Sequence, residues 1–500
     1  MLERSFRATR GSATLSSRPP VASQTRRLRC ANVSSVGLPR RGCCGSRARR
    51  MRASLAASQV PSGSGGPDGV RRLVVAVGGL RWSGLTKYLA RLGWSCWVVT
   101  AASPAGTEVA NGVTVESCPR RRTLNDVYRW LRLRPGLQRV GRGPNEPFGE
   151  PLEQAALGWV ARMRLEAAML LSVPDHGRGW ILRAAARARR LIAAVQPDAV
   201  VSSGPPHSTH LAAWLATRGR RTRWLVDLRD PWAGPIAATW RSSPAYQSLL
   251  SRWLSMRLER LVIPSANGVI CTTRDFAAAL RASYPGVSVE WVPNAADREL
   301  LPARSPDPFP GLGIVYAGTL YGTYDLGPVL RALRRFLDRH PPAAAQGTKL
   351  RIAGHIEPHH ERALRLEVTA RGLERFVESA GVLSREAALN LVARSRLAIV
   401  LAHRSEWQVP AKLYELVAME IPTLVVAPGE SPAVREAVRL GATVAAPDDV
   451  AAIERLMEAL WLGRMSAPRD PNVEVLVDYR DRAARVSRVL AGMDGTAQPE

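Results

Sequence analysis

The stretch VPAKLYELVAMEIPTLVVA, residues 409–427, decides the fold class. A helix is predicted over 411–419, with Pro410 in its first turn, where a missing N–H is tolerated, and Pro422 follows its end. The aliphatic and β-branched run 423–427 is typical of a strand buried on both faces, as in a parallel sheet. A helix leading directly into such a strand predicts an α/β fold.

Lys412 and Glu415 share one face of this helix because they are three residues apart. One interpretation is a surface salt bridge, which contributes little to stability. The other is a ligand site, because the N-terminus of a helix and a lysine ammonium both attract phosphate. The choice depends on whether the rest of the chain builds a ligand-binding edge around this helix.

The same alternation of strands and helices fills most of the chain. RRLVVAV (71–77), RWLVDL (223–228) and GIVYAG (313–318) read as strands, and 181–195 reads as one of the intervening helices. Residues 297–311 break the pattern with four prolines and are predicted to link two domains. Two Rossmann-like domains follow, each with a doubly wound parallel sheet, facing a cleft at the carboxyl ends of the strands.

Charge and composition limit the classes of function. The 500 residues carry a formal charge of +28, and 46% of them are hydrophobic. Residues 1–60 alone hold thirteen arginines and one acid, a net +12. This Arg- and Ser-rich tail has no apolar periodicity, so we expect it to be disordered. Two interpretations of it stay open: an organellar transit peptide, or an upstream start with Met51 nearer the true beginning.

Metal-binding and membrane signals are weak. No CxxC or Cys/His spacing is present, so a zinc site is not expected. No run approaches the roughly 20 apolar residues of a membrane span. We therefore expect a soluble cytoplasmic protein, with attachment to the inner leaflet of a membrane as an option.

Four motifs carry a family resemblance: SSGPPHSTH (202–210), VDLRDPW (226–232), VPNAADRELLP (292–302) and VPAKLYELVAMEIPTLVVAPGES (409–431). Together they resemble the family-4 glycosyltransferases of the bacterial cell-envelope type, whose two-Rossmann architecture is called GT-B. The resemblance covers residues 71–490. It implies transfer of a sugar, with retention, from a nucleotide sugar to a lipid-linked or glycan acceptor, generally without a metal. The chain has no DxD motif, which agrees.

The resemblance also assigns roles to the regions. We predict a disordered tail over 1–70, an N-terminal acceptor domain over 71–296, a C-terminal nucleotide-sugar domain over 312–474 and a last helix with its tail over 475–500. One position departs from the family pattern. The family often has two glutamates separated by seven residues, and if Glu415 is the second, Trp407 stands at the first, with Glu406 adjacent.

The nucleotide-sugar site is predicted to comprise Gly79, Gly318, Thr319, Gly354, His355, Lys412 and Glu415. Glycines at strand ends let the backbone approach the nucleotide, although ordinary turns would explain them too. Lys412 would hold the diphosphate and Glu415 the ribose hydroxyls. In this context we favour the ligand site over the salt bridge.

The catalytic candidates are His207, Asp227, Arg229 and Asp230, which follow two neighbouring strands. They would position the acceptor or move its proton. A structural ion-pair cluster explains Asp227, Arg229 and Asp230 equally well, and His207 could simply cap its helix. No strong external base is required if the departing phosphate takes the proton.

Two alternative functions remain open. A sugar-nucleotide epimerase or hydrolase would use the same fold, and a nucleic-acid-binding protein would explain the basic charge. The latter lacks interleaved basic and aromatic motifs, so no nucleic-acid partner is expected. Besides the nucleotide sugar and the acceptor, an anionic membrane surface is a candidate partner. The reason is a group of arginines in one insertion: Arg120, Arg121, Arg122, Arg129, Arg132, Arg134 and Arg139. A solvated basic loop explains these arginines equally well.

Overall fold

The computed structural model describes residues 71–77, 80–101, 105–110, 112–123, 126, 159–233, 249–322, 324–402, 407–465 and 475–493. Everything below refers to these residues. The Arg-rich tail, Gly79 and Arg129, Arg132, Arg134 and Arg139 of the basic insertion lie outside them. Asp68–Glu500 form one compact unit, which contains two sheets.

The first sheet has eight strands in the order β3-β4-β2-β1-β5-β6-β7-β8. Their bounds are β1 Arg71–Val77, β2 Trp94–Thr100, β3 Gly106–Ala110, β4 Val113–Ser117, β5 Ala199–Gly204, β6 Arg223–Leu228, β7 Gly268–Cys271 and β8 Val289–Trp291. All neighbours are parallel except β3, which pairs antiparallel with β4. The predicted parallel sheet is confirmed, and a short hairpin adds one antiparallel strand at this edge.

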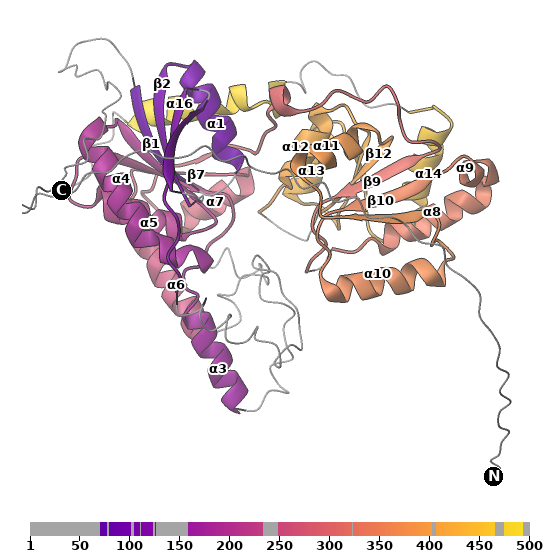
Figure 1. Ribbon diagram of the computed structural model, residues 1–500, viewed down its shortest axis with the longest axis horizontal. Coiled ribbons are helices and arrows are strands. Elements are labelled where there is room, and N and C mark those ends of the chain that lie inside the picture. The colour runs from indigo at the N-terminus through magenta and orange to yellow at the C-terminus, as the bar shows by residue number, and fades with distance from the viewer. Residues whose placement is uncertain are drawn as a thin grey trace, which may run out of the picture. The chain divides into compact units, whose positions relative to one another are not determined.

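Helices cover both faces of the first sheet (Figure 1). They are α1 Leu80–Arg91, the 3-10 helix η2 His176–Trp180, α4 Ile181–Val195, α5 Ser208–Thr217, α6 Leu249–Val262 and α7 Arg274–Ser283. A further helix, α3 Trp159–Leu170, contacts α6 and projects away from the sheet (Figure 1). Successive strand residues point to opposite faces. Val74, Val200 and Val226 therefore join the core under α4 and α5, while Leu73 and Val201 join the core under α1.

The second sheet has six parallel strands in the order β11-β10-β9-β12-β13-β14. Their bounds are β9 Gly313–Ala317, β10 Lys349–Ala353, β11 Val377–Gly381, β12 Leu397–Leu401, β13 Thr423–Val426 and β14 Thr443–Ala445. Numbered within the domain, this is the 3-2-1-4-5-6 order of a Rossmann fold. In that order β9 and β12 flank the point where the strand order reverses, which is where ligands bind.

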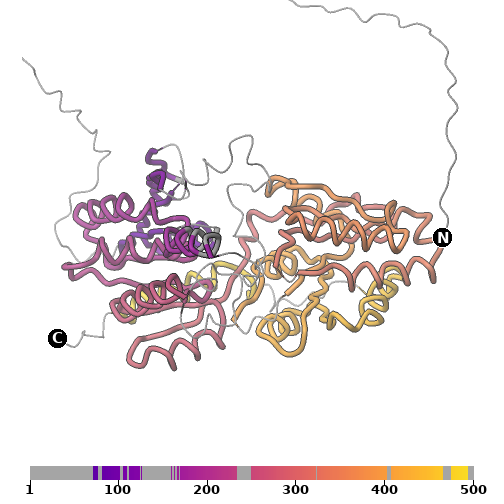
Figure 2. The backbone as a smooth tube through the Cα atoms, turned by 90° about the horizontal axis from the view of Figure 1, so that it is seen from below, coloured from indigo at the N-terminus to yellow at the C-terminus, as the bar shows by residue number. Residues whose placement is uncertain are grey.

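The helices of the second sheet also form two layers, as the turned view in Figure 2 shows. They are α8 Gly327–Arg339, α9 Pro341–Ala345, α10 Pro358–Ala370, α11 Arg385–Ala393, α12 Ala411–Ala418, α13 Pro432–Arg439 and α14 Val450–Trp461. Ile314 and Ile399 lie in the core with α8 and α14. Val315 and Val400, one residue along each strand, lie in the core with α11, α12 and α13.

The last helix, α16 (Tyr479–Gly492), packs on the first sheet rather than on the second. Val486 shares a core with Leu73 of β1 and Leu85 of α1. The approach to α1 is close, because a Cβ built on Gly84 would lie 2.6 Å from the ring of Tyr479. The chain therefore builds the first domain from both ends of its described length. None of the described helices is long and apolar enough to cross a membrane.

Candidate active site

Two glycines meet at the carboxyl edge of the second sheet. Gly318 follows β9 and Gly354 follows β10, and the Gly318 N–H donates to the carbonyl of Ala353 (2.8 Å). A Cβ built on Gly354 would lie 2.2 Å from the carbonyl oxygen of Gly318, and the φ of Gly354 is +139°. Only glycine fits there, since both the space and the backbone angle exclude a side chain. The backbone at this edge is thus open to a close-lying ligand.

The ammonium of Lys412 lies beside Gly318, the first glycine of this pair. Lys412 is in the first turn of α12, and its Nζ lies 3.5 Å from the carbonyl oxygen of Ala317 and 4.3 Å from the centre of the Tyr316 ring. A Cβ on Gly318 would lie 2.7 Å from the same Nζ. The side chain is half-buried, and this burial lowers the pKa of Lys412 to about 8.

No carboxylate of the described residues lies within ion-pair distance of Lys412. The alternative interpretation from the sequence, a salt bridge between Lys412 and Glu415, is therefore wrong. Glu415 instead pairs with Arg385 of α11, with 2.7 Å between Oε1 and a guanidinium nitrogen. No side chain caps the N-terminus of α12 either, since its N-cap residue is Pro410. A cation and a helix N-terminus together form a place for an anion.

The loops after β9 and β10 are tied to each other. The Leu320 N–H donates to the carbonyl of His355 (2.9 Å), and the Glu357 N–H donates to the carbonyl of Leu320 (3.1 Å). Thr319 is exposed, and its carbonyl accepts a hydrogen bond from the hydroxyl of Tyr316 (2.8 Å). The structure thus brings together Gly318, Thr319, Gly354, His355 and Lys412, five of the seven predicted donor-site residues.

Asp227 belongs to a buried network of the first domain. Its Oδ2 accepts hydrogen bonds from Trp82 Nε1 (2.7 Å) and Ser203 Oγ (2.7 Å) and lies 3.3 Å from Arg81 Nε. The side chain has no exposed surface. Arg81 also donates to the carbonyl of Val292 (2.7 Å), so the network ties α1 to β6 and to the segment after β8. This environment favours the structural interpretation of Asp227.

His207 precedes α5 and is nearly buried. Its ring stacks on Trp232 with centroids 4.9 Å apart and an interplanar angle of 6°. Burial, together with the nearby His210 and Arg229, lowers the pKa of His207 well below its usual value. The ring is therefore neutral at pH 7. The helix-cap alternative is not supported, because no side chain caps α5.

Asp230 is the acidic candidate that contacts the segment leading to Lys412. Gln408 donates a hydrogen bond to Asp230 from the stretch just before α12. Burial raises the pKa of Asp230, while Arg229 and the Gln408 bond oppose the rise. A carboxyl with a raised pKa beside a ligand-binding helix is a candidate acid or base. Arg229 itself donates to the carbonyl of Pro205 and supports the turn after β5.

Trp407 occupies the position at which the family pattern places its first glutamate. Its carbonyl accepts a hydrogen bond from Thr273 Oγ1 (2.9 Å), and its ring lies 6.4 Å from Phe276. The side chain packs against the core of the first domain. Trp407 thus has a packing role, and the neighbouring Glu406 lies outside the described residues.

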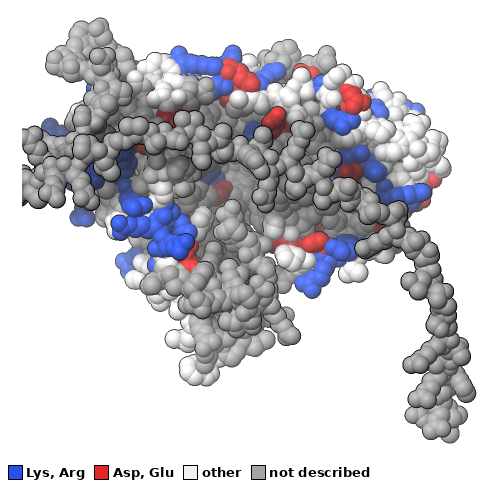
Figure 3. Space-filling view, in the orientation of Figure 1, with Lys and Arg blue, Asp and Glu red and all other residues white. Residues whose placement is uncertain are grey.

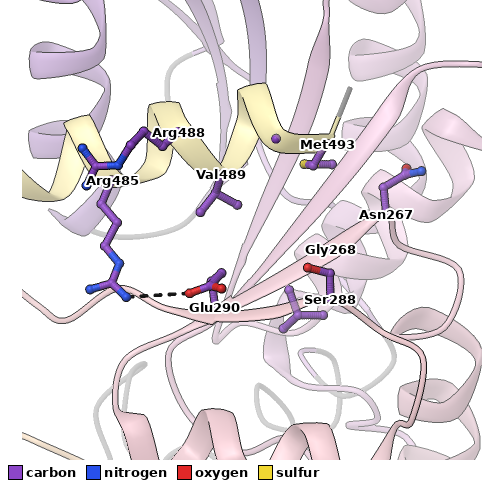
Figure 4. A pocket seen from close by; sticks show the side chains of 10 residues that line it. Asn267, Gly268, Ser288, Glu290, Arg485, Arg488, Val489 and Met493 are labelled. Atoms are coloured by element: carbon purple, nitrogen blue, oxygen red, sulfur yellow. Dashed lines mark ion pairs between the residues drawn. The ribbon is translucent and has the colours of Figure 1, made fainter. Parts of the chain in front are cut away.

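The pocket in Figure 4 lies away from these groups, at the amino ends of β7 and β8. It has a volume of about 480 Å³ and is bordered by α16, which supplies Arg485 and Arg488. The Arg485 guanidinium lies 3.7 Å from the carboxylate of Glu290, so one of the two positive charges that line the pocket is already matched. The candidate site is therefore not this pocket but the edge of the second sheet that carries Gly318, Gly354 and Lys412.

Comparisons with known proteins agree with the geometry. Residues 78–295 match the family model described as a glycosyl transferase 4-like domain. No curated protein matches the chain.

Solved structures share the fold at low identity. Sucrose-phosphate synthase from Thermosynechococcus elongatus is 13% identical, with 85% of this chain and 100% of that chain covered and a TM-score of 0.56. α,α-Trehalose 6-phosphate synthase from Burkholderia multivorans is 15% identical, with 86% and 100% covered and a TM-score of 0.55. Anabaena HepE in complex with UDP and glucose is 14% identical, with 84% and 100% covered and a TM-score of 0.50. At such identities the likeness shows the fold, GT-B, and confirms the predicted architecture.

Proposed function

We propose that this chain of the GT-B fold is a glycosyltransferase, and that it moves a sugar, with retention, from a nucleotide-sugar donor to a lipid-linked or cell-envelope glycan acceptor. The observation that carries the donor proposal is the ammonium of Lys412. It lies beside the strand-end glycine Gly318, which Gly354 contacts in turn, at the switch point of a Rossmann-type sheet, with no carboxylate partner among the described residues. Such a site suits a diphosphate.

The donor would be held by three features. Its diphosphate would lie at the N-terminus of α12 beside Lys412, close to the backbone of Gly318 and Gly354. Glu415, one turn further along α12, would accept hydrogen bonds from the ribose hydroxyls. To do so it would exchange its partner Arg385 for the ligand, which is feasible because the pair is partly exposed.

The chemistry follows from charge development on the leaving group. The bond between the anomeric carbon and the diphosphate oxygen breaks, and the bond from the acceptor oxygen to that carbon forms on the same face. The acceptor's proton passes to the departing phosphate, so no external base is needed. The ammonium of Lys412 binds the phosphate more strongly as its negative charge grows, which lowers the barrier. No metal takes part in this proposal.

On the acceptor side, Asp230 and His207 are the proposed positioning groups. Asp230 is hydrogen-bonded to Gln408 on the donor side, and its raised pKa suits a hydrogen bond to a hydroxyl. The neutral ring of His207 can donate or accept without carrying charge. Asp227 is assigned a structural role, because its Oδ2 accepts hydrogen bonds from Arg81, Trp82 and Ser203.

Exposed apolar side chains support a membrane-bound acceptor. α3 and α6 contact each other, and both carry large hydrophobic residues in water. These are Trp159 (77% exposed), Met163 (63%), Leu249 (84%), Leu250 (51%) and Trp253 (49%). Exposed apolar clusters on a monomer mark sites of interaction. We propose that these helices contact the cytoplasmic leaflet of a membrane, with Arg120, Arg121 and Arg122 attracted to anionic lipid.

The donor proposal is tested by thermal shift with UDP, GDP, ADP and dTDP on the full chain. One of them is expected to raise Tm, because a ligand at a hundredfold its Kd adds about 2.7 kcal/mol of stability. A chain that responds to none of the four would contradict the donor site. The anomeric configuration of the product, read by NMR, then tests retention.

The acceptor proposal is tested separately, by sedimentation with liposomes and by product analysis. Pelleting is expected to require anionic lipid and to weaken with salt. A Trp253→Glu variant on α6 should pellet less than the parent. The matched control is Leu366→Glu, which changes an exposed apolar side chain on α10. Trp214→Glu on α5 would not serve as a control, because Trp214 packs against the core. Equal pelleting with neutral liposomes, or transfer only to a soluble sugar phosphate, would contradict the lipid-linked acceptor.

The two other functions are separable from transfer. An epimerase or hydrolase would convert the nucleotide sugar with no acceptor present. Nucleic-acid binding is not favoured by the surface: on the face in Figure 3, the described basic side chains lie in several separate groups, most beside acidic ones. Tight, salt-sensitive DNA binding by a chain that begins at Arg71 would support that alternative instead.

A further inference from the structure

Three potential metal ligands converge at the start of α10. They are Glu357, which precedes the helix, and His359 and His360 in its first turn. One ligand atom from each lies within 4.8 Å of the other two. His359 Nδ1 is 3.8 Å from the Glu357 carboxylate, and the two imidazole centroids are 4.0 Å apart. The convergence of these three side chains is seen only in the structure.

Two imidazoles and one carboxylate form a recognised ligand set for divalent transition metals. Zn²⁺ binds imidazole nitrogen and carboxylate oxygen at about 2.0–2.2 Å, so tetrahedral ligands lie about 3.3 Å apart. The separations found are wider, and small side-chain rotations would close them. Three protein ligands leave a fourth position for water.

His360 is oriented as a metal ligand usually is. One nitrogen of its ring donates a hydrogen bond to the backbone carbonyl of Gly322. The other nitrogen, Nε2, is buried and has no hydrogen-bond partner in the described part of the chain. A metal-bound histidine typically donates its second N–H to such a carbonyl, which fixes the tautomer.

A simple ion pair does not account for the cluster. Glu357 and His359 alone could form one, as His340 and Glu458 do at 3.6 Å elsewhere in the same domain. That explanation leaves the buried Nε2 of His360 without a function. An unsatisfied buried nitrogen is costly unless something binds it.

We propose that Glu357, His359 and His360 bind one divalent transition-metal ion of the Zn²⁺ type. The site lies where the loop that follows β10 enters α10, and this loop also contains Gly354. Through the Gly322 carbonyl and the bonds between Leu320 and both His355 and Glu357, the ion fixes this loop against the one after β9. Its role is to order the glycine-lined edge. It is separate from the chemistry assigned to Lys412 and does not depend on it.

The test uses the full chain, free of any affinity tag and stripped with a chelator. Zn²⁺ binding is measured by equilibrium dialysis, and Co²⁺ is added as a spectroscopic probe of the ligands. The variants are His360→Ala and Glu357→Gln, each compared with His340→Ala, which breaks the two-group pair instead. Thermal unfolding in EDTA shows whether each variant is folded.

The parent and His340→Ala are expected to bind one more equivalent of Zn²⁺ than His360→Ala does, and to show the visible Co²⁺ band of nitrogen and oxygen ligands. Glu357→Gln should weaken binding by at least about tenfold. Zn²⁺ should raise the Tm of the parent and not that of His360→Ala. Equal stoichiometry in the parent and His360→Ala would overturn the proposal. A band typical only of thiolates would do so too, since it would place the ion on cysteines.

Discussion

At the carboxyl ends of β5 and β6 in the first domain, three donors converge on one oxygen of Asp227, whereas the ends of β9 and β10 in the second domain are lined by glycine and one lysine. Lys412 has a backbone carbonyl at 3.5 Å and an aromatic ring. A buried carboxylate with matched donors holds a fold together, while a half-buried cation without a matched anion is available to a ligand.

The largest effect is expected from neutralising Asp227, the buried carboxylate whose donors are present in the structure. Asp227→Asn removes the charge that faces Arg81 and should lower the free energy of unfolding by about 3–5 kcal/mol, because an unpaired buried charge remains. Asp275→Asn is the matched control, since its pair with Arg435 is exposed and should contribute less than about 1 kcal/mol. Denaturant unfolding measures both. An Asp227→Asn chain of normal stability but without activity would return Asp227 to the catalytic group.

The second test concerns the only donor-site residue with a carboxylate. Glu415→Ala should weaken nucleotide affinity about ten- to a hundredfold, because hydrogen bonds to a charged group contribute about 1.5–3 kcal/mol. Arg385→Ala removes the partner of Glu415 and should leave that affinity nearly unchanged. Calorimetry separates the two variants. Equal losses in both would mean that the ion pair, and not the ribose contact, is what matters.

A third and smaller effect follows from the pKa of Lys412. Its value of about 8 in the folded chain lies below the ordinary 10.5, so the charge opposes folding below pH 8 and this opposition fades between about pH 8 and 10.5. Nucleotide binding needs the charged form, so affinity should fall as pH rises above about 8. The diphosphate is already ionised there. Titrations at pH 7 and pH 9 measure the fall, and proton uptake near pH 8, seen as a buffer-dependent heat, should accompany it. A pH-independent affinity would argue against a phosphate contact.

The sequence predicted the elements well because buried parallel strands are continuous apolar runs. Ile181–Val195 and Arg223–Leu228 appear within the predicted bounds. The antiparallel β3 was missed, because GTEVA is short and has little apolar character. The position of α16 was also not predictable, since nothing in its own residues indicates that it packs on the first sheet.

The candidate site was predictable only where local geometry determines it. Lys412 and the strand-end glycines follow from the strand–helix pattern, because that pattern places all of them at one edge. The strand–helix pattern does not predict which charged side chains pair with each other. Arg81 is 146 residues from Asp227, and Arg385 is 30 residues from Glu415. Such pairs depend on tertiary packing, so the choice between ion pair and ligand site could not be made from the sequence.

The role of Lys412 as the phosphate-binding group is tested by the Lys412→Met variant, with Tm and nucleotide affinity measured on the same sample. Methionine keeps the side-chain length and removes the charge. We predict that affinity for the nucleoside diphosphate with the largest thermal shift falls at least about tenfold, while Tm stays the same or rises because a half-buried charge is gone. Lys349→Met, which removes an exposed lysine 3.9 Å from Glu378, should change neither. A Lys412→Met chain that binds this nucleotide as tightly as the parent would contradict the account.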